Sequence, residues 1–267
     1  MKHITALFLL WSTSALAQSA AVAVDVNPGS GSSSPDRLIA FGDDLVFVAI
    51  DTTNGPRALY HFDTGTSTLT QLVERAEWTS AAKAPHNLAA TDSLVFFLAT
   101  TDEAGEELWR TDGTPAGTFM VKDIVPGTGS PYWGGAFFTE LVATPDRLYT
   151  KLNDNGAQYG DEVCTSDGTE AGTTILTDLR PGTSSSQPTA LTVVGNRLHW
   201  FASDGMGGSK VRIWDGATLQ TIDGLTYANS NSDFAPLGDK VIAFAKATSN
   251  GLYLIDPVNL TFDQLAL

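Results

Sequence analysis

Two groups of acidic residues are the sequence's clearest candidates for chemistry. The first group consists of Asp36, Glu140 and Asp233, which belong to three separate segments of the chain. Two carboxyl groups about 5–10 Å apart can serve as acid and base, or acid and nucleophile, in glycoside hydrolysis. If the fold brings these segments to one axis, the three residues predict a glycan-cleaving site. The competing interpretation is a set of solvated acids at a rim.

The second group lies in a loop that begins Asn153-Asp154-Asn155-Gly156 and continues to Asp161 and Glu162. Dense oxygen ligands of this kind can hold Ca²⁺. The loop lacks the alternating D-x-D-x-D order of calcium loops, and Asn-Gly is an ordinary hairpin turn signal. We therefore expect no cofactor, with Ca²⁺ at Asp154, Asp161 and Glu162 as the open alternative.

Other catalytic residue types do not form a pattern. His61, His86 and His199 lack metal-ligand spacing, and the sequence contains neither a G-x-S-x-G elbow nor a phosphate-binding Gly-Lys loop. The single cysteine, Cys164, stands where other repeats carry an aromatic residue, which indicates a small buried side chain and not a nucleophile.

The elements that would position these residues come from an internal repeat. The segment EELWRTDGTPAGT, at 106–118, returns as DEVCTSDGTEAGT at 161–173. Asp followed by Gly and Thr is turn chemistry, because the carboxylate accepts backbone N–H groups and Gly takes a positive φ. We interpret the following repeated residues as structural turns: Asp63, Asp112, Gly113, Thr114, Asp167, Gly168, Thr169 and Asp256.

A second landmark, a polar turn followed by an apolar strand, recurs five times. It ends at Leu45, Leu94, Leu148, Leu198 and Val241, in steps of 49, 54, 50 and 43 residues. Each step holds four short runs rich in β-branched and aromatic residues, which is typical of a propeller blade. The sequence predicts an all-β propeller of about five four-stranded blades in one domain over 18–267. The expected blades cover about 36–85, 86–138, 139–188, 189–231 and 232–267, after a terminal strand and linker at 21–35.

Adjacent columns in the third strand support stacked blades. One column is apolar and the next mostly aromatic, and neighbouring strand residues point to opposite faces. The first column holds Leu59, Leu108, Val163, Ile213 and Leu252, and the second holds Tyr60, Trp109, Cys164, Trp214 and Tyr253. Two apolar faces predict a strand enclosed between two neighbouring blades.

These motifs resemble those of bacterial secreted proteins named for an E-L-W-x-x-D-G-T repeat. The stretch from Glu107 to Thr114 matches that pattern completely, and the stretch from Glu162 to Thr169 matches except at two apolar positions. The turn is also similar to the Asp-box of sialidase-type propellers. The resemblance implies an exported β-propeller, and it supplies no catalytic residues.

The N-terminal segment and the net charge agree with an exported binding module. Lys2 and His3, an apolar run and a small-residue site at Ala15-Leu16-Ala17 predict a signal peptide over 1–17, and no later segment is long enough to span a membrane. A net charge of −15 disfavours nucleic acid. We expect a secreted, periplasmic or cell-surface, non-catalytic binding or scaffold module for an extracellular protein or carbohydrate. The alternative is a glycan-cleaving hydrolase that uses the three carboxylates.

The termini predict how the ring of blades closes. Val22 to Val26 has the pattern of a fourth strand, while 262–267 can serve the last blade in the same way. Propellers often close by pairing a strand from one terminus with the other terminal blade. We expect Val22 to Val26 to pack at the junction between the first and last blades, to pair with the last blade and to close the ring near the two termini. The alternative is a sixth, incomplete blade or an open ring.

Export is testable on the full-length chain. After expression in a bacterium, the protein should be recovered outside the cytoplasm with an N-terminus at or near Gln18. N-terminal sequencing checks this, and a soluble cytosolic protein that starts at Met1 would contradict it.

Overall fold

The computed structural model describes residues 24–51, 55–130, 140–152, 158–229 and 232–265. Across these ranges all regular secondary structure is β-strand, which confirms the all-β prediction. No helix in the described part of the chain is long and apolar enough to cross a membrane.

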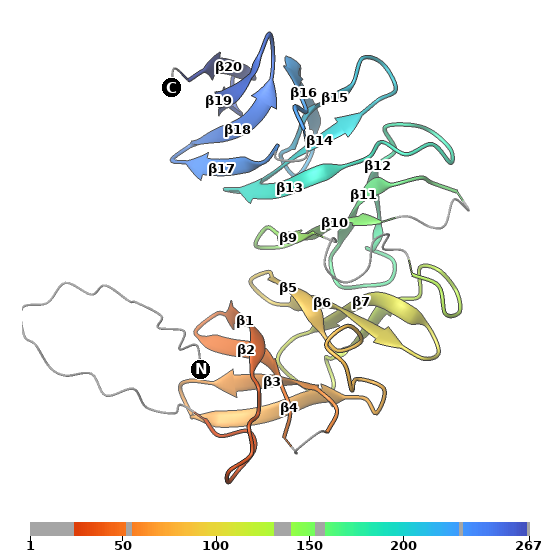
Figure 1. Cartoon of the computed structure of the whole chain (residues 1–267), viewed down its shortest axis with the longest axis vertical. Coiled ribbons are helices and arrows are strands. Elements are labelled where there is room, and N and C mark those ends of the chain that lie inside the picture. Colours follow the sequence, from red (N-terminus) through yellow and green to blue (C-terminus); the bar gives the residue numbers. More distant parts are fainter. Residues whose placement is uncertain (1–23, 52–54, 131–139, 153–157, 230–231, 266–267) are drawn as a thin grey trace, which may run out of the picture.

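The strands form consecutive antiparallel meanders of four (Figure 1). The first sheet contains β1 (Asp36–Phe41), β2 (Asp44–Ala49), β3 (Ala58–Asp63) and β4 (Thr68–Glu74). The second contains β5 (His86–Ala90), β6 (Val95–Thr101), β7 (Gly105–Thr111) and β8 (Phe119–Lys122). The third contains β9 (Leu141–Ala143), β10 (Leu148–Leu152), β11 (Glu162–Ser166) and β12 (Thr174–Thr177).

The last two meanders are linked. The fourth contains β13 (Thr189–Val194), β14 (Arg197–Ser203), β15 (Ser209–Trp214) and β16 (Leu219–Thr226). The fifth contains β17 (Phe234–Leu237), β18 (Lys240–Lys246), β19 (Asn250–Asp256) and β20 (Thr261–Gln264). A single residue pair, Thr226 with Lys246, joins β16 to β18, so the two meanders form one eight-stranded sheet. We keep the terms fourth and fifth sheet for the two halves.

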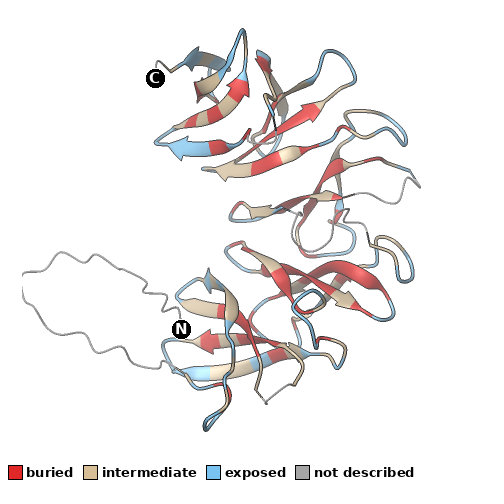
Figure 2. Ribbon diagram, viewed as in Figure 1, coloured by how far each residue is buried: buried red, intermediate tan, exposed pale blue. Residues whose placement is uncertain are grey.

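The sheets stack face to face through the two columns predicted from the sequence. In the apolar column, Leu59, Leu108, Val163 and Ile213 are all buried against the following sheet. In the second column, Trp109, Cys164, Trp214 and Tyr253 pack against the preceding sheet. Figure 2 shows the buried residues concentrated in these central strands. The first strands β1, β5, β9, β13 and β17 contact one another in series and form the inner edge.

The expected ring closure is not observed among the described residues. The five sheets form an arc whose first and last members lie at opposite ends (Figure 1). The expected strand at Val22 to Val26 lies partly outside the described residues, and its described part is not a strand. Val24 and Val26 pack on the outer face of the first sheet, against Phe47 and Tyr60. The fifth sheet keeps its own fourth strand, since β20 pairs with β19.

The packing of Val26 predicts that the N-terminal segment stabilises the first sheet and not the fifth. Val26 is 8 % exposed on the first sheet, whereas Val258 is 65 % exposed. Val26→Asp should lower the free energy of unfolding by about 2–3 kcal/mol, because it puts a carboxylate against an apolar face. Val258→Asp is the matched control and should change it by less than about 0.5 kcal/mol. Urea denaturation measures both, and equal effects of the two variants would contradict the packing of Val26.

Candidate functional site

The repeated Asp-Gly-Thr residues build two nearly identical turns. Asp112 Oδ1 accepts hydrogen bonds from Thr114 N at 2.9 Å and from Thr114 Oγ1 at 2.6 Å. In the next repeat, Asp167 Oδ1 accepts the same two bonds from Thr169 at 2.9 and 2.7 Å. These hydrogen bonds lower the pKa of both carboxyl groups. The two aspartates hold turns together.

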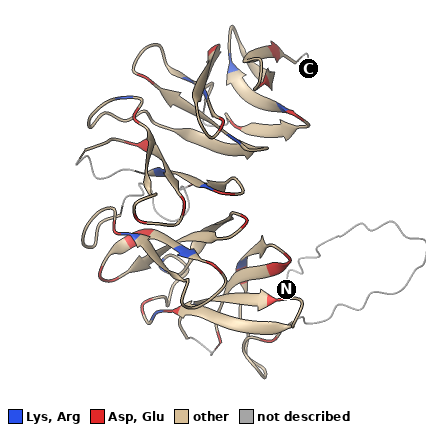
Figure 3. Ribbon diagram, turned by 180° about the vertical axis from the view of Figure 1, so that it is seen from behind, with Lys and Arg blue, Asp and Glu red and all other residues tan. Residues whose placement is uncertain are grey.

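The remaining members of each turn complete the same network. Gly113 and Gly168 have φ values of 88° and 84°, a region that favours glycine, and each N–H donates to the hydroxyl two residues earlier. Thr114 Oγ1 and Thr169 Oγ1 each accept the N–H three residues later. Asp63 and Asp256 accept backbone N–H groups in corresponding turns. In the ribbon of Figure 3, many of the positions coloured for Asp and Glu fall in turns and near strand ends.

The glutamate that opens each motif has a role that the sequence did not reveal. Glu107 and Glu162 are fully buried, and each binds the linker that leaves its sheet. Glu107 Oε1 accepts Val125 N at 3.3 Å, and Glu162 Oε2 accepts Leu179 N at 3.5 Å. Glu162 also accepts Ser186 N at 3.1 Å and Ser186 Oγ at 2.7 Å. Each glutamate therefore connects the third strand of its sheet, by hydrogen bonds, to the linker that follows the fourth strand.

Glu162 is also one of the three candidate calcium ligands, and its hydrogen bonds limit what else it can bind. Both of its carboxylate oxygens already accept protein donors, and burial raises its pKa. The main-chain oxygen of Asp161 accepts Ser186 N, and Asp154 lies outside the described residues. Within the described ranges, no three His, Cys, Asp or Glu side chains are arranged to hold a metal ion.

The three carboxylates of the candidate glycosidase site have different partners. Asp36 Oδ2 pairs with Arg57 Nη1 of the first sheet at 3.2 Å. Glu140 Oε2 accepts Leu191 N of the fourth sheet at 2.6 Å. Burial of the Glu140 carboxyl group raises its pKa, and the negative charge of Asp233 makes a smaller contribution in the same direction. Asp36 is instead paired with Arg57, beside its own sheet.

The three histidines outside the N-terminal segment are scattered. His61 Nε2 lies 3.0 Å from Asp44 Oδ2 in the first sheet. His86 is buried, and its Nε2 lies 3.2 Å from Glu106 Oε1, although the pair lacks hydrogen-bond geometry. Burial lowers the pKa of His199 to about 4, so this imidazole is neutral at physiological pH. They provide no shared catalytic centre.

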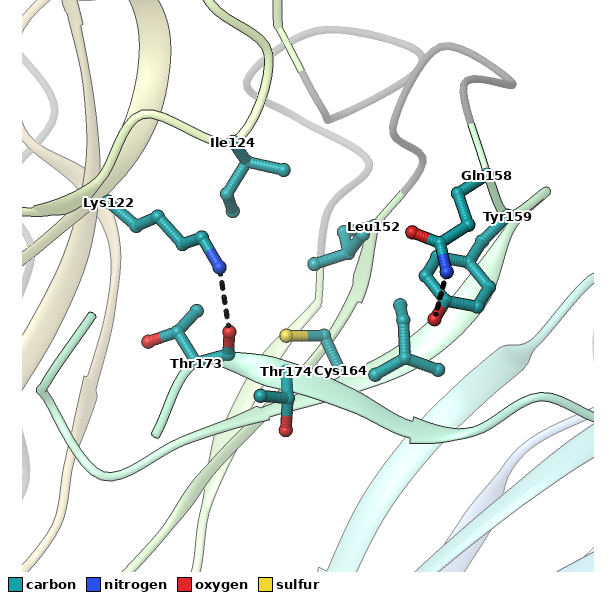
Figure 4. A pocket seen from close by; sticks show the side chains of 9 residues that line it. Lys122, Ile124, Leu152, Gln158, Tyr159, Cys164, Thr173 and Thr174 are labelled. Carbon is teal, nitrogen blue, oxygen red and sulfur yellow. Dashed lines mark hydrogen bonds between the residues drawn. The ribbon is translucent and has the colours of Figure 1, made fainter. Parts of the chain in front are cut away.

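Cys164 lines a pocket of 330 Å³ between the second and third sheets (Figure 4). Its sulfur points into a mostly apolar space beside Leu152, and Lys122 Nζ donates to the main-chain oxygen of Thr173. Burial raises the pKa of the Cys164 thiol to about 12. A thiol with so high a pKa is a poor nucleophile at neutral pH, as expected for a small buried side chain.

A larger pocket of 490 Å³ lies between the third and fourth sheets, at the end where the hairpin turns gather. Three turns supply it: the β9–β10 turn, the β13–β14 turn and the turn after β15. Its lining combines aromatic, charged and amide side chains: Thr144, Asp146, Arg147, Tyr149, Thr165, Leu176, Asn196, Trp214, Asp215 and Gly216. We call this the turn pocket.

The polar groups of the turn pocket are held in place. Thr144 Oγ1 donates to Asp146 Oδ1 at 3.0 Å, and Arg147 Nη1 lies 4.0 Å from Asp167 Oδ2. Asp215 accepts two backbone N–H groups of its own turn, which lower its pKa. Trp214 is half-buried and is one of the residues that line the pocket. A fixed indole beside acid, amide and guanidinium groups is suited to a polar ligand that has an apolar face.

One departure from the repeat pattern marks the position of the turn pocket in the sequence. In the fourth repeat Asp215 follows Trp214 directly, while in the other repeats the aspartate comes three residues after the aromatic column. Asp146 and Asn196 belong to two of the five landmark turns that precede the second strands. These two turns come together because adjacent sheets are stacked, and a single sequence does not specify that stacking.

Comparisons with known proteins support the fold only. No family model matches the chain. No curated protein matches it either.

Solved structures do resemble the chain. One, from a study of two prolyl endopeptidases, has a TM-score of 0.54 and 11 % identity over 88 % of this chain and 36 % of that one. A puromycin hydrolase mutant complexed with PGG has a TM-score of 0.51 and 14 % identity over 89 % of this chain and 38 % of that one. The β-propeller domain of the Trilobed protease from Pyrococcus furiosus has a TM-score of 0.47 and 12 % identity over 87 % of this chain and 67 % of that one. The first two structures, with TM-scores above 0.5, show a likeness of fold alone, and this chain spans little more than a third of each of them.

The buried position of Glu107 predicts a pH effect on stability. Burial raises the pKa of Glu107 to about 8, well above its value of 4.5 in an exposed chain. A carboxyl group with a raised pKa in the folded state favours folding at low pH, and that contribution is lost as pH rises toward the folded pKa. Between pH 5 and pH 8 the wild type should therefore lose roughly 3 kcal/mol that Glu107→Gln does not lose.

Urea denaturation at both pH values measures this difference. Glu103→Gln is the matched control, because Glu103 is 73 % exposed, and it should keep the wild-type pH dependence. The same slope with pH in the wild type and Glu107→Gln would contradict the assignment.

Proposed function

We propose that this chain is an exported, non-catalytic binding module of the β-propeller type, with about five blades, and that it binds carbohydrate in the turn pocket. The observation that carries the proposal is Trp214 at the wall of this pocket, with Asp146, Arg147 and Asn196 around it. Sugars present an apolar ring face together with hydroxyl groups that donate and accept hydrogen bonds. An indole combined with carboxylate, amide and guanidinium groups suits both properties.

The volume of 490 Å³ falls within the ordinary range for small-ligand sites, whether catalytic or not. One further observation favours binding over catalysis. The motif carboxylates of Asp112, Asp167, Glu107 and Glu162 are engaged in hydrogen bonds that hold turns and linkers. Export rests on the N-terminal pattern of residues 1–17 and on the resemblance to secreted repeat proteins.

A glycan-cleaving hydrolase is the second candidate. The observation that favours it is the electrostatic interaction between Glu140 and Asp233, with the raised pKa of Glu140 suited to an acid. Asp36, paired with Arg57, would not take part. In this alternative, Glu140→Gln would abolish cleavage of a glycan that the protein still binds.

Binding is tested with a glycan array followed by calorimetry on the best oligosaccharide. Trp214→Ala should weaken that binding at least about tenfold, because the sugar loses its apolar platform. Trp214 also packs against the sheet core, so a second variant, Asn196→Ala at an exposed turn position, should also weaken binding while the melting temperature stays unchanged.

Glu103→Gln serves as the exposed control and should bind like the wild type. An array without any binding, or affinity that is the same in the wild type and both pocket variants, would overturn the carbohydrate assignment. Product formation that depends on Glu140 would favour the hydrolase instead.

A further inference from the structure

The pocket between the second and third sheets lies where one member of the aromatic column is missing. In the other four sheets this position of the third strand carries Tyr or Trp, whereas the third sheet carries Cys164. Between the first and second sheets the ring of Trp109 occupies the corresponding position, with its centroid 6.1 Å from that of Phe97 and 6.0 Å from that of Trp78. Beside Cys164 the structure has a cavity of 330 Å³ instead. We call it the column pocket.

A second departure from the repeat meets the first in this pocket. In the first sheet, Val73 pairs with Leu59 and joins the apolar cluster between the first and second sheets. In the second sheet, Lys122 pairs with Leu108 in the same way, so a lysine stands where the first sheet has a valine. Figure 4 shows the side chains of Lys122 and Cys164 directed toward the same space. One interface has thus lost an aromatic ring and gained an ammonium group.

The rest of the wall suits an apolar ring. Leu152 is buried, and Ile124 and Ile175 are partly buried, all in the apolar cluster that contains Cys164. A large-to-small replacement leaves a cavity whose lining lacks partner atoms, and small aromatic molecules bind such cavities because they restore the lost contacts. The ring that fits here is the counterpart of the side chain that the column lacks.

Lys122 adds a charged donor to this wall. Its Nζ donates to the main-chain oxygen of Thr173 at 3.3 Å, which uses one of the three N–H bonds of the ammonium group. Among the described residues, no Asp or Glu forms an ion pair with Lys122. The net charge of −15 opposes anions at long range, but salt screens that field beyond about 10 Å, so contact with the ammonium group decides. A single lysine in so acidic a chain suits a singly charged carboxylate better than a phosphate.

We propose that the column pocket binds a small aromatic carboxylic acid. Its ring occupies the space that the missing column side chain leaves, and its carboxylate accepts hydrogen bonds from Lys122 Nζ. This site is separate from the turn pocket and does not depend on carbohydrate binding there, because the two pockets share no lining residue.

Calorimetry on the whole protein with phenylacetate as the probe tests the proposal. Phenylacetate should bind with a Kd of about 1 mM or tighter, and phenylacetamide, which has the same shape without the charge, should bind at least about tenfold more weakly. Lys122→Gln should weaken phenylacetate binding to the level of the amide. Arg147→Gln removes a cation from the turn pocket, so it is the matched control and should bind phenylacetate like the wild type.

Two substitutions at position 164 test where the ring lies. Cys164→Trp restores the column and should abolish binding, because the indole fills the pocket. Cys164→Ala removes the thiol but keeps the space, so it should bind phenylacetate within about twofold of the wild type.

The Lys122 and Arg147 variants decide the question if Cys164→Trp does not fold. No binding of phenylacetate by the wild type at about 10 mM would overturn the proposal. Equal affinity for phenylacetate and phenylacetamide would also overturn it, as would binding that survives Lys122→Gln and is lost in Arg147→Gln.

Discussion

Each sheet in this protein has two apolar faces, and burying both is the constraint that organises the chain. An isolated four-stranded sheet of this composition would leave Leu108 on one side and Trp109 on the other in water. Stacking removes both from solvent, and each sheet is stabilised by contacts with its nearest neighbours. The five hydrophobic clusters follow this pattern: four lie between adjacent sheets, and the fifth lies between the first sheet and Val24 and Val26.

The polar motif residues serve the same stacking. The Asp-Gly-Thr turns reverse the chain between the third and fourth strands, and the buried Glu107 and Glu162 bind the linkers that carry the chain to the next sheet. Turns and linkers therefore have fixed positions relative to the sheets. The turn pocket depends on this, because its walls come from turns of two different sheets. Its shape is a product of how one sheet sits against the next.

Local patterns predicted the local structure well. The four-stranded unit, the two columns and the Asp turns all depend on residues close in the chain, and Cys164 proved to be buried in its aromatic column. What failed was long-range. The N-terminal segment was expected on the last blade, but Val26 lies on the first, and both positions offer an apolar face of similar character. The burial of the motif glutamate was also not predicted. A charged residue near the start of a strand indicates exposure, whereas Glu107 is buried and accepts a hydrogen bond from Val125 N, 18 residues away.

The open arc has a consequence for how such a chain changes length. In a closed ring the angles between adjacent blades must add up to a full turn, so adding or losing one blade changes the angle at every interface. In an arc joined only by nearest neighbours, a duplicated repeat would add one more sheet at an end and leave the existing interfaces as they are. Only one backbone-paired couple of residues, Thr226 and Lys246, joins the fourth and fifth sheets. Packing of apolar side chains provides most of the contact at that junction. Growth by duplication would then be limited by the need to cover the last apolar face, whatever the number of sheets before it.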